Sequence, residues 1–230
     1  MRLDIYLTEN SLCKSRTAAQ SLIKSGGVSL NGIPCTKPSQ EVGESDTVDI
    51  IGEQLRYVGR GGLKLEAALD KFALDITGAE CIDIGSSTGG FTDCMLQHGA
   101  AKVWALDESL RRDSRVVSME QTDIRTAELP QVDFIGTDVS FISLKLILPH
   151  IYRLLKSGGR AAVLIKPQFE AGRSNLSKKG IVRDEKVRLR IRDETAEFAQ
   201  GCGFSVIGTE TSPITGGDGN TEYLMCLEKR

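Results

Sequence analysis

The chain has 230 residues, of which 40% are hydrophobic and 26% charged, as expected for a soluble globular protein with a hydrophobic core. Its formal net charge of −2 means that any binding of nucleic acid has to come from local basic surfaces. No apolar run is long enough to cross a membrane as a helix, and the N-terminus, which contains acids, does not have the pattern of a signal peptide.

Cysteine and histidine usage argues against zinc and against a disulfide framework. No two cysteines form a C-x-x-C pair, and the histidines are His98 and His150, so the sequence predicts no metal site. Scattered cysteines in a chain of this length are typical of buried cytosolic thiols, so we expect a cytoplasmic protein. The cysteines are Cys13, Cys35, Cys81, Cys94, Cys202 and Cys226.

Residues 1–52 are predicted to form a small α+β module. Ser15 is placed to cap a helix that runs to Gly26, where two glycines favour a helix end. Asn31-Gly32 lies between two short apolar segments and predicts a tight hairpin. A further short strand is expected at 48–51.

Basic side chains concentrate in the first part of this module. Residues 1–40 contain five basic side chains and two acids, whereas residues 41–53 contain five acids and no base. This separation indicates a basic face for phosphates, although a charge cluster is more often solvated surface. The residues expected to contact RNA here are Arg2, Lys14, Ser15, Arg16, Lys24 and Lys37, followed by Arg60.

The order of residues in the module resembles the S4 RNA-binding domain, which is named after a ribosomal protein. The resemblance covers nearly the whole module and implies that it binds RNA. It rests on Arg2-Leu-Asp4, Ser15-Arg16, Ala19, Ile23, Gly27-Val28, Asn31-Gly32, Lys37 and Asp46.

After a linker at 53–62, residues 63–230 alternate between strand and helix patterns. This alternation predicts an α/β domain with a doubly wound, mostly parallel seven-stranded sheet of the Rossmann-like kind. The expected strands are 81–85, 102–106, 116–119, 132–137, 160–165, 204–208 and 222–227. Helices are expected around 65–72 and at 91–98, 143–156 and 184–200.

The stretch CIDIGSSTGGFT, which begins at Cys81, reads as a strand followed by a glycine-rich turn and a helix. Its glycine spacing matches neither the dinucleotide fingerprint nor the phosphate loop. The acid inside the strand, Asp83, and the small residues of the turn suit a cofactor without phosphate and with a cationic centre, so we expect S-adenosylmethionine. The alternative is a tight turn with a surface aspartate. The candidate cofactor residues are Asp83, Gly85, Ser86, Ser87, Thr88, Gly89, Gly90 and Phe91, with Asp107, Asp123 and Asp138 at later strand ends.

Asp138 and Lys166 end consecutive predicted strands, so both are expected to face one cleft at the carboxyl edge of the sheet. Glu222 opens the last strand, and Lys64 can reach the cleft from the preceding helix. A lysine at a strand end is more commonly a surface residue whose stem packs on the domain.

At this point the chain resembles the TlyA family, which joins an S4 domain to an FtsJ-like methyltransferase domain. The resemblance runs almost end to end. It rests on Gly61-Gly-Leu-Lys64, on the turn Asp83 to Thr92, on Asp138-Val-Ser-Phe-Ile-Ser143, on Ile165-Lys-Pro-Gln-Phe-Glu170 and on Gly219-Asn-Thr-Glu222.

The resemblance implies 2′-O-methylation of ribosomal RNA, at a cytidine in the 16S or 23S molecule or in both, with ribosomal subunits as partners. It also matches Lys64, Asp138, Lys166 and Glu222 to the catalytic set of the family. We assign Lys166 as the base that deprotonates the ribose hydroxyl, and Lys64 as the cation that stabilises the developing alkoxide. Asp138 and Glu222 would orient the two lysines. Methyl transfer of this kind requires no metal.

The chain departs from the family after Asp107, which runs directly into Glu108–Arg112 without the usual turn and aromatic-containing helix. The assignment of Asp107 to the adenosine side depends on this shorter segment. Three other functions stay open: a membrane-active hemolysin, a nicotinamide oxidoreductase, and an RNA-binding protein with an inactive methyltransferase domain.

A second basic segment follows the predicted strand that ends at Lys166. Residues 173–192 contain eight basic side chains and two acids. Glycines at 172 and 180 make the first half a loop that we expect to overhang the cleft, whereas the second half reads as a solvated helix face. The residues expected to contact RNA are Arg173, Lys178 and Lys179.

Overall fold

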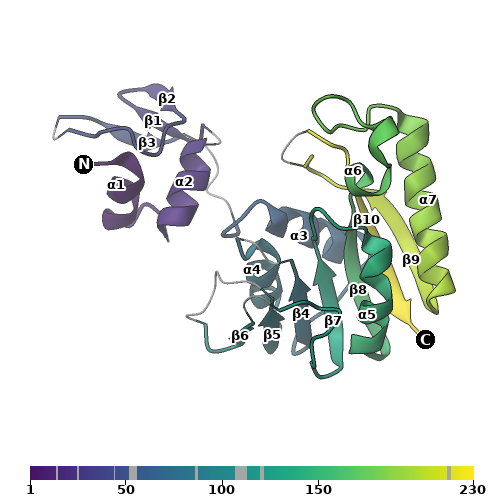
Figure 1. Cartoon of the computed structure of the whole chain (residues 1–230). Coiled ribbons are helices and arrows are strands. Elements are labelled where there is room, and N and C mark those ends of the chain that lie inside the picture. The colour runs from purple at the N-terminus through teal and green to yellow at the C-terminus, as the bar shows by residue number, and fades with distance from the viewer. Residues whose placement is uncertain are drawn as a thin grey trace. The chain divides into compact units, whose positions relative to one another are not determined.

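The computed structural model describes residues 1–13, 15–24, 26–43, 45–51, 56–85, 88–106, 113–119, 122–216 and 219–230. These residues form two compact units, Met1–Arg60 and Gly61–Arg230 (Figure 1). The first unit is a small α+β module, and the second is a mixed α/β domain, so the predicted fold class is confirmed. Of the residues predicted to have functional roles, Lys14, Ser86, Ser87 and Asp107 lie outside the described residues.

In the first unit, two helices share a core with a three-stranded antiparallel sheet of order β2-β1-β3. Its elements are α1 (Leu3–Glu9), α2 (Arg16–Lys24), β1 (Val28–Leu30), β2 (Ile33–Cys35) and β3 (Val48–Ile50). Leu3 and Leu7 of α1 and Ile23 of α2 are fully buried, because residues four apart on a helix share one face.

Two local sequence signals in this unit act as predicted. The hydroxyl of Ser15 accepts a hydrogen bond from the backbone N–H of Ala18 at 3.2 Å and thereby caps α2. Asn31 and Gly32 have φ angles of 53° and 77°, which is the left-handed conformation that a two-residue hairpin turn requires. The helix cap and the hairpin are therefore confirmed.

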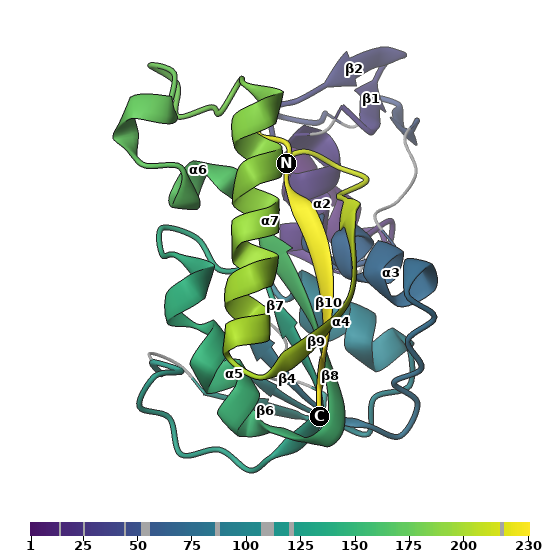
Figure 2. The same cartoon turned by 90° about the vertical axis from the view of Figure 1, so that its right-hand side faces the viewer.

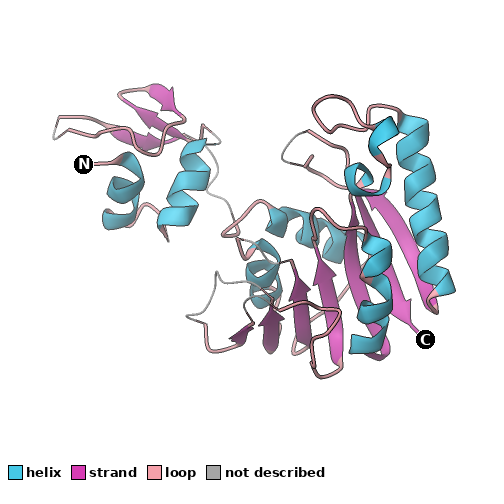
Figure 3. Cartoon of the chain, in the orientation of Figure 1, coloured by secondary structure: helices cyan, strands magenta, loops and turns pink. Residues whose placement is uncertain are grey.

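The second unit is built on a seven-stranded sheet of order β6-β5-β4-β7-β8-β10-β9, in which β10 runs antiparallel to both of its neighbours. Helices α3 and α4 cover one face of the sheet, and α5 and α7 cover the other (Figures 2 and 3). The strands are β4 (Glu80–Ile84), β5 (Lys102–Ala105), β6 (Val116–Ser118), β7 (Val132–Thr137), β8 (Leu155–Ile165), β9 (Phe204–Thr211) and β10 (Tyr223–Lys229). The helices are α3 (Gly61–Lys71), α4 (Gly90–Gln97), α5 (Leu148–Leu154), α6 (Pro167–Glu170) and α7 (Glu185–Gly201), with short 3₁₀ turns at Leu144–Leu146 and Arg173–Asn175.

The prediction of one helix over 143–156 was wrong in its bounds. The 3₁₀ turn Leu144–Leu146 comes first, α5 follows, and β8 begins at Leu155, five residues before the predicted start at Arg160. Pro149 lies in the first turn of α5, where its missing N–H is tolerated, and it cannot continue a helix from further upstream. Gly158, with a φ of 75°, accompanies the shift in register between β7 and β8.

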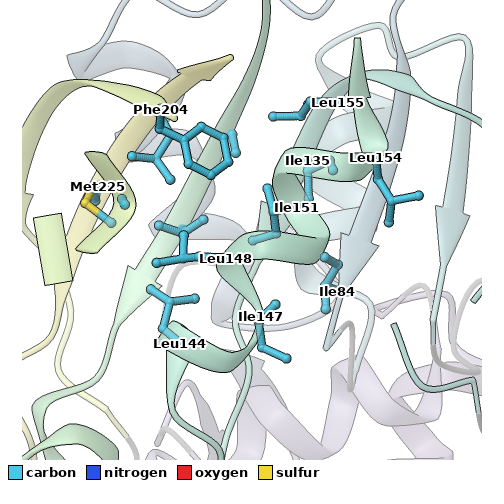
Figure 4. Close-up of a cluster of buried hydrophobic side chains, with 14 of the residues drawn as sticks. Ile84, Ile135, Leu144, Ile147, Leu148, Ile151, Leu154, Leu155, Phe204 and Met225 are labelled. Atoms are coloured by element: carbon cyan, nitrogen blue, oxygen red, sulfur yellow. The ribbon is translucent and has the colours of Figure 1, made fainter. Parts of the chain in front are cut away.

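A hydrophobic core between α5 and the sheet fixes the strands that carry the site. Leu148, Ile151 and Leu154 of α5 pack at helical spacing against strand residues that include Ile135 of β7 (Figure 4). Each of these side chains is at most 1% exposed, and burial stabilises the fold by roughly 1.5–3 kcal/mol for a side chain of this size. This packing holds β7 and β8 in place, so the residues at their ends are positioned rigidly.

Candidate active site

The strand order brings three predicted site residues to one edge of the sheet. Strands β7 and β8 are parallel neighbours, and Asp138 and Lys166 directly follow them. Tyr223, the first residue of β10, pairs with Ile165, the last residue of β8. Because β10 runs in the opposite direction, Glu222 precedes its strand and lies at the same edge as Asp138 and Lys166.

The four side chains predicted to be catalytic form a continuous chain of ionic contacts. Nζ of Lys64, on the first turn of α3, lies 2.6 Å from Oε2 of Glu222 and 3.6 Å from Oδ2 of Asp138. The other carboxylate oxygen of Asp138 lies 2.5 Å from Nζ of Lys166. The Lys166 ammonium also donates a hydrogen bond to the hydroxyl of Ser140 at 2.8 Å. The structure therefore brings all four residues together.

This network is largely removed from water. The side chains of Lys64, Glu222 and Lys166 are 9%, 2% and 10% exposed, and that of Asp138 is 19% exposed. Two ammonium groups and two carboxylates balance in charge, which limits the cost of burying them. Asp138 is the most accessible of the four and contacts both lysines, so it lies between the buried Lys64–Glu222 pair and Lys166.

Neighbouring residues restrict the position of Glu222. Gln168 donates a hydrogen bond to Oε1 of Glu222 at 3.0 Å. A Cβ atom added to Gly216 would lie 2.5 Å from the same oxygen, so glycine leaves the room that the carboxylate needs. Asn220, which is 2% exposed, hydrogen-bonds through its amide to the backbone of 180–182 at 3.1 and 3.2 Å. The loop before β10 is thereby attached to the loop that follows α6, which we call the basic loop because it carries Arg173, Lys178 and Lys179.

A cavity of about 170 Å³ adjoins the network on the side of the glycine-rich turn. Asp138 and Lys166 line it together with residues of the turn, of α4 and of the start of α3. The lining residues are Gly61, Gly85, Thr88, Gly90, Phe91, Asp138, Ser140 and Lys166. Five of the predicted cofactor residues (Gly85, Thr88, Gly90, Phe91 and Asp138) therefore lie around one cavity beside the two ion pairs.

Glycine and a buried aspartate shape the turn between β4 and α4. Gly85 has a φ of 86°, and a Cβ atom there would lie 2.9 Å from the backbone oxygen of Asp138, so the two strand ends approach closely only with glycine. Asp83 is completely buried, and its carboxylate accepts a hydrogen bond from Thr92 of α4 at 2.6 Å. Asp83 thus holds the first turns of α4 against β4, while Gly89, with a φ of 80°, precedes that helix.

Asp123, the remaining predicted cofactor residue among those described, has a local partner. Its carboxylate lies 2.6 Å from the guanidinium of Arg125, and both side chains are about half exposed, at 43% and 50%. Hydrogen bonds from Arg125 lower the pKa of Asp123 to about 2. Asp123 is not one of the residues that line the described cavity.

The basic residues predicted to bind RNA are mostly exposed. In the first unit, Lys24, Lys37 and Arg60 are exposed, Ser15 caps α2, and Arg2 and Arg16 both bind the buried Asp4. In the second unit, the exposed residues are Arg173, Lys178 and Lys179, on the segment that leaves α6.

The loops after β7 and β8 are joined by residues that the sequence pattern did not indicate. The carboxylate of Glu170 accepts hydrogen bonds at 2.6 Å from the hydroxyl of Ser143 and from the N–H of Leu144. Phe141 is 91% exposed, has a φ of 63°, and its ring lies 5.2 Å from that of Phe169. The sequence signal that could have indicated Phe141 is an aromatic residue within the polar loop at the end of a strand, because a ring in such a loop is seldom buried in the core.

Comparison with known proteins assigns both units to families. The family model of the FtsJ-like methyltransferases matches residues 57–229, and that of the S4 domain matches residues 1–48. None of the helices formed by the described residues is long and apolar enough to cross a membrane.

Individual relatives extend over almost the whole chain. The chain is 38% identical over 238 residues to the 16S/23S rRNA (cytidine-2′-O)-methyltransferase TlyA of Mycobacterium tuberculosis, covering 98% of this chain and 89% of the relative. It is 41% identical over 238 residues to hemolysin A of Brachyspira hyodysenteriae, covering 97% and 98%. A solved structure from Streptococcus thermophilus with a provisional hemolysin name is 44% identical with a TM-score of 0.78, covering 100% of this chain and 88% of that one. The chain therefore belongs to the FtsJ-like methyltransferase family and carries an S4 domain at its N-terminus.

Proposed function

We propose that the protein transfers a methyl group from S-adenosylmethionine to the 2′-hydroxyl of a ribose in ribosomal RNA, at a cytidine of the 16S or 23S molecule or of both. The observation that carries this proposal is the chain of contacts from Glu222 through Lys64 and Asp138 to Lys166, beside the cavity of the glycine-rich turn. The name of the M. tuberculosis relative supports the same reaction. Ribosomal RNA as substrate would place the protein in the cytoplasm.

The residues around the cavity fit S-adenosylmethionine. This cofactor has a positive amino group, a sulfonium and an adenosine but no phosphate, and the cavity offers a carboxylate, Asp138, and glycine backbone at Gly85 and Gly90. When bound, the cofactor supplies a methyl group that is activated by the positive sulfur. Gly85, Gly90 and Asp138 would hold it, while Asp83 would act indirectly by fixing the turn through Thr92.

The four ionic residues suit deprotonation of a weakly acidic hydroxyl. In the proposed step the ribose 2′-oxygen forms a bond to the methyl carbon as the bond from that carbon to sulfur breaks. Lys166 acts after its ammonium has released a proton to solvent, and the resulting neutral amine takes the hydroxyl proton at Nζ. Lys64 stabilises the negative charge that develops on the oxygen, and Asp138 and Glu222 hold the two lysines in place.

Cofactor choice can be tested by thermal unfolding. S-adenosylmethionine or its demethylated product, S-adenosylhomocysteine, is expected to raise the melting temperature of the chain, and NAD is not, because a ligand stabilises only the state that binds it. Asp83→Ala is expected to abolish the increase, and Asp75→Ala, which changes an exposed aspartate before β4, to retain it. An increase with NAD alone would contradict the proposed cofactor.

The exposed basic loop is proposed to bind RNA phosphates next to the site. Phe141 is proposed to offer a planar surface on which a base can stack.

Replacing Lys178 and Lys179 with alanine is expected to weaken RNA binding regardless of the RNA sequence. It is also expected to flatten the dependence of log K on log salt by about one unit per lost phosphate contact. Cofactor affinity should not change.

The control for this variant removes the same charge elsewhere. Lys71→Ala with Lys156→Ala deletes two lysines whose side chains are 58% and 44% exposed, at the last turn of α3 and at the opposite end of β8 from Lys166. Filter binding or fluorescence anisotropy over a series of salt concentrations gives both slopes. Equal slopes for the two double variants would place the RNA contacts away from the basic loop.

The reaction itself is tested by incubating the protein with labelled S-adenosylmethionine and separated ribosomal subunits, and then mapping the label. We expect label on ribose of one or a few defined nucleotides. Binding to subunits without transfer of label would support an RNA-binding protein with an inactive methyltransferase domain, and label on a base would contradict the proposed chemistry.

A further inference from the structure

The first unit contains a buried carboxylate that holds two arginines. Asp4, on the first turn of α1, is 0% exposed. Its Oδ1 and Oδ2 accept hydrogen bonds from Nε and Nη2 of Arg2 at 2.9 and 3.0 Å. Oδ2 also accepts from Nε of Arg16 at 2.9 Å and from Nε2 of Gln20 at 2.7 Å. Four hydrogen bonds from two helix positions and the N-terminal segment thus converge on one carboxylate.

The two guanidinium groups remain accessible although Asp4 is buried. The side chains of Arg2 and Arg16 are 43% and 52% exposed. A guanidinium has five N–H donors in a planar fork. Asp4 accepts hydrogen bonds from Nε and Nη2 of Arg2 and from Nε of Arg16. Nη1 of Arg2 and both Nη groups of Arg16 take no part in these hydrogen bonds.

Fixed arginines bind anions at a lower entropic cost than mobile ones. An exposed arginine loses rotamer freedom when it binds a phosphate, and this loss weakens binding. Asp4 has already restricted both side chains in the free protein. The hydrogen bonds from Arg2, with those from Gln20 and Arg16, hold the pKa of Asp4 well below its usual range, so the carboxylate stays ionised at any working pH.

We propose that Asp4 is a positioning residue for RNA binding, which holds Arg2 and Arg16 as a preformed pair of guanidiniums for phosphates of the RNA backbone. This inference rests on the proposed function of the first unit as an RNA-binding module. Asp4 itself does not contact RNA. Its contribution is to fix the direction and spacing of two side chains that come from positions 2 and 16 of the chain.

Simple electrostatics predicts the opposite effect of removing this carboxylate. A negative charge close to the binding surface repels phosphates, so its loss should strengthen RNA binding. If Asp4 positions the arginines, its loss should weaken RNA binding, because both side chains become mobile. The sign of the change therefore separates the two effects, and a purely structural role would alter stability without a specific change in RNA affinity.

The test compares Asp4→Asn with Glu9→Gln in the full chain. Both variants remove one negative charge from α1, but Glu9 is exposed and is not a partner of Asp4. Binding to purified ribosomal subunits is measured over a series of salt concentrations, at a temperature where thermal unfolding shows each variant to be folded. Asp4→Asn is expected to bind about tenfold more weakly than the wild type, from the freedom of two arginine side chains. Glu9→Gln is expected to bind as tightly as the wild type or more tightly.

A second comparison keeps the inference testable if Asp4→Asn does not fold. Arg16→Lys keeps the positive charge but loses the planar fork that Asp4 fixes, so it is expected to weaken binding with little change in salt slope. The same affinity as the wild type in Arg16→Lys, or tighter binding in folded Asp4→Asn, would overturn the positioning role.

The Arg2→Ala/Arg16→Ala variant separates this inference from the function on which it rests. If it binds subunits as tightly as the wild type, the arginines do not hold RNA, and the RNA-binding role proposed for these residues fails together with the inference. If it binds weakly, adding Asp4→Asn should cause no further loss, because the carboxylate then has no arginine to position. A further specific loss would show that Asp4 acts in another way.

Discussion

Replacing Lys166 with alanine is expected to lower the rate of methyl transfer by about 10²–10⁴-fold, the usual contribution of a general base. The affinity for S-adenosylmethionine should change little, because the proton is taken only in the transition state. Single-turnover transfer to ribosomal subunits gives the rate, and thermal shift with S-adenosylhomocysteine gives the binding. The prediction follows from the place of Lys166 at the end of β8, in contact with Asp138 and Ser140.

Lys166→Arg distinguishes a base from a positive charge. Arginine keeps the charge next to Asp138 but does not give up its proton at working pH, so this variant is expected to be as inactive as the alanine variant. Lys156→Ala is the matched control, because Lys156 lies near the other end of the same strand and pairs with Asp133. Near-normal turnover in Lys166→Arg would show that Lys166 acts as a cation, and the base would have to be another group.

Strand ends were predictable because they follow from local patterns. The apolar run at 132–137 predicted β7 with the bounds that the structure shows, Val132–Thr137. Because alternating strands and helices form a parallel sheet, the polar residues that follow neighbouring strands lie at the same edge of that sheet. Asp138 and Lys166 could be placed together on that ground alone. Glu222 joined them through β10, whose antiparallel direction the spacing of residues does not reveal.

Contacts between loops distant in sequence were not predictable. Gln168 reaches Glu222 across 54 positions, and Glu170 binds the loop at Ser143, because β7, β8 and β10 are neighbours in the sheet. The start of the chain shows a second limit. Leu3, Ile5 and Leu7 occupy alternate positions, as the residues of one strand face do, but Leu3 and Leu7 form one face of the helix α1. Arg2 and Arg16 could be recognised from the sequence only as separate charges, because their shared partner Asp4 is set by the fold.

The buried pair of Lys64 and Glu222 gives the second large effect. Replacing Glu222 with leucine leaves the Lys64 ammonium buried, with Asp138 at 3.6 Å as its remaining ionic contact among the described residues. We expect this change to lower the free energy of unfolding of the second unit by about 3–5 kcal/mol, the cost of leaving one buried charge without its partner. Methyl transfer should be lost as well. Denaturant unfolding and single-turnover transfer measure the two effects.

Restoring stability without restoring activity is the sharper part of this prediction. In Lys64→Met/Glu222→Leu neither charge remains, so stability is expected to return to near the wild-type value while methyl transfer stays lost. The matched control is the more exposed ion pair between Lys71, on the same helix as Lys64, and Glu210 of β9; their side chains are 58% and 42% exposed and lie 3.0 Å apart. Breaking it with Glu210→Leu should cost at most about 1 kcal/mol and leave activity unchanged. Wild-type stability in Glu222→Leu would contradict the buried ion pair, whereas activity in the stabilised double variant would mean that Lys64 and Glu222 hold the fold and take no part in the chemistry.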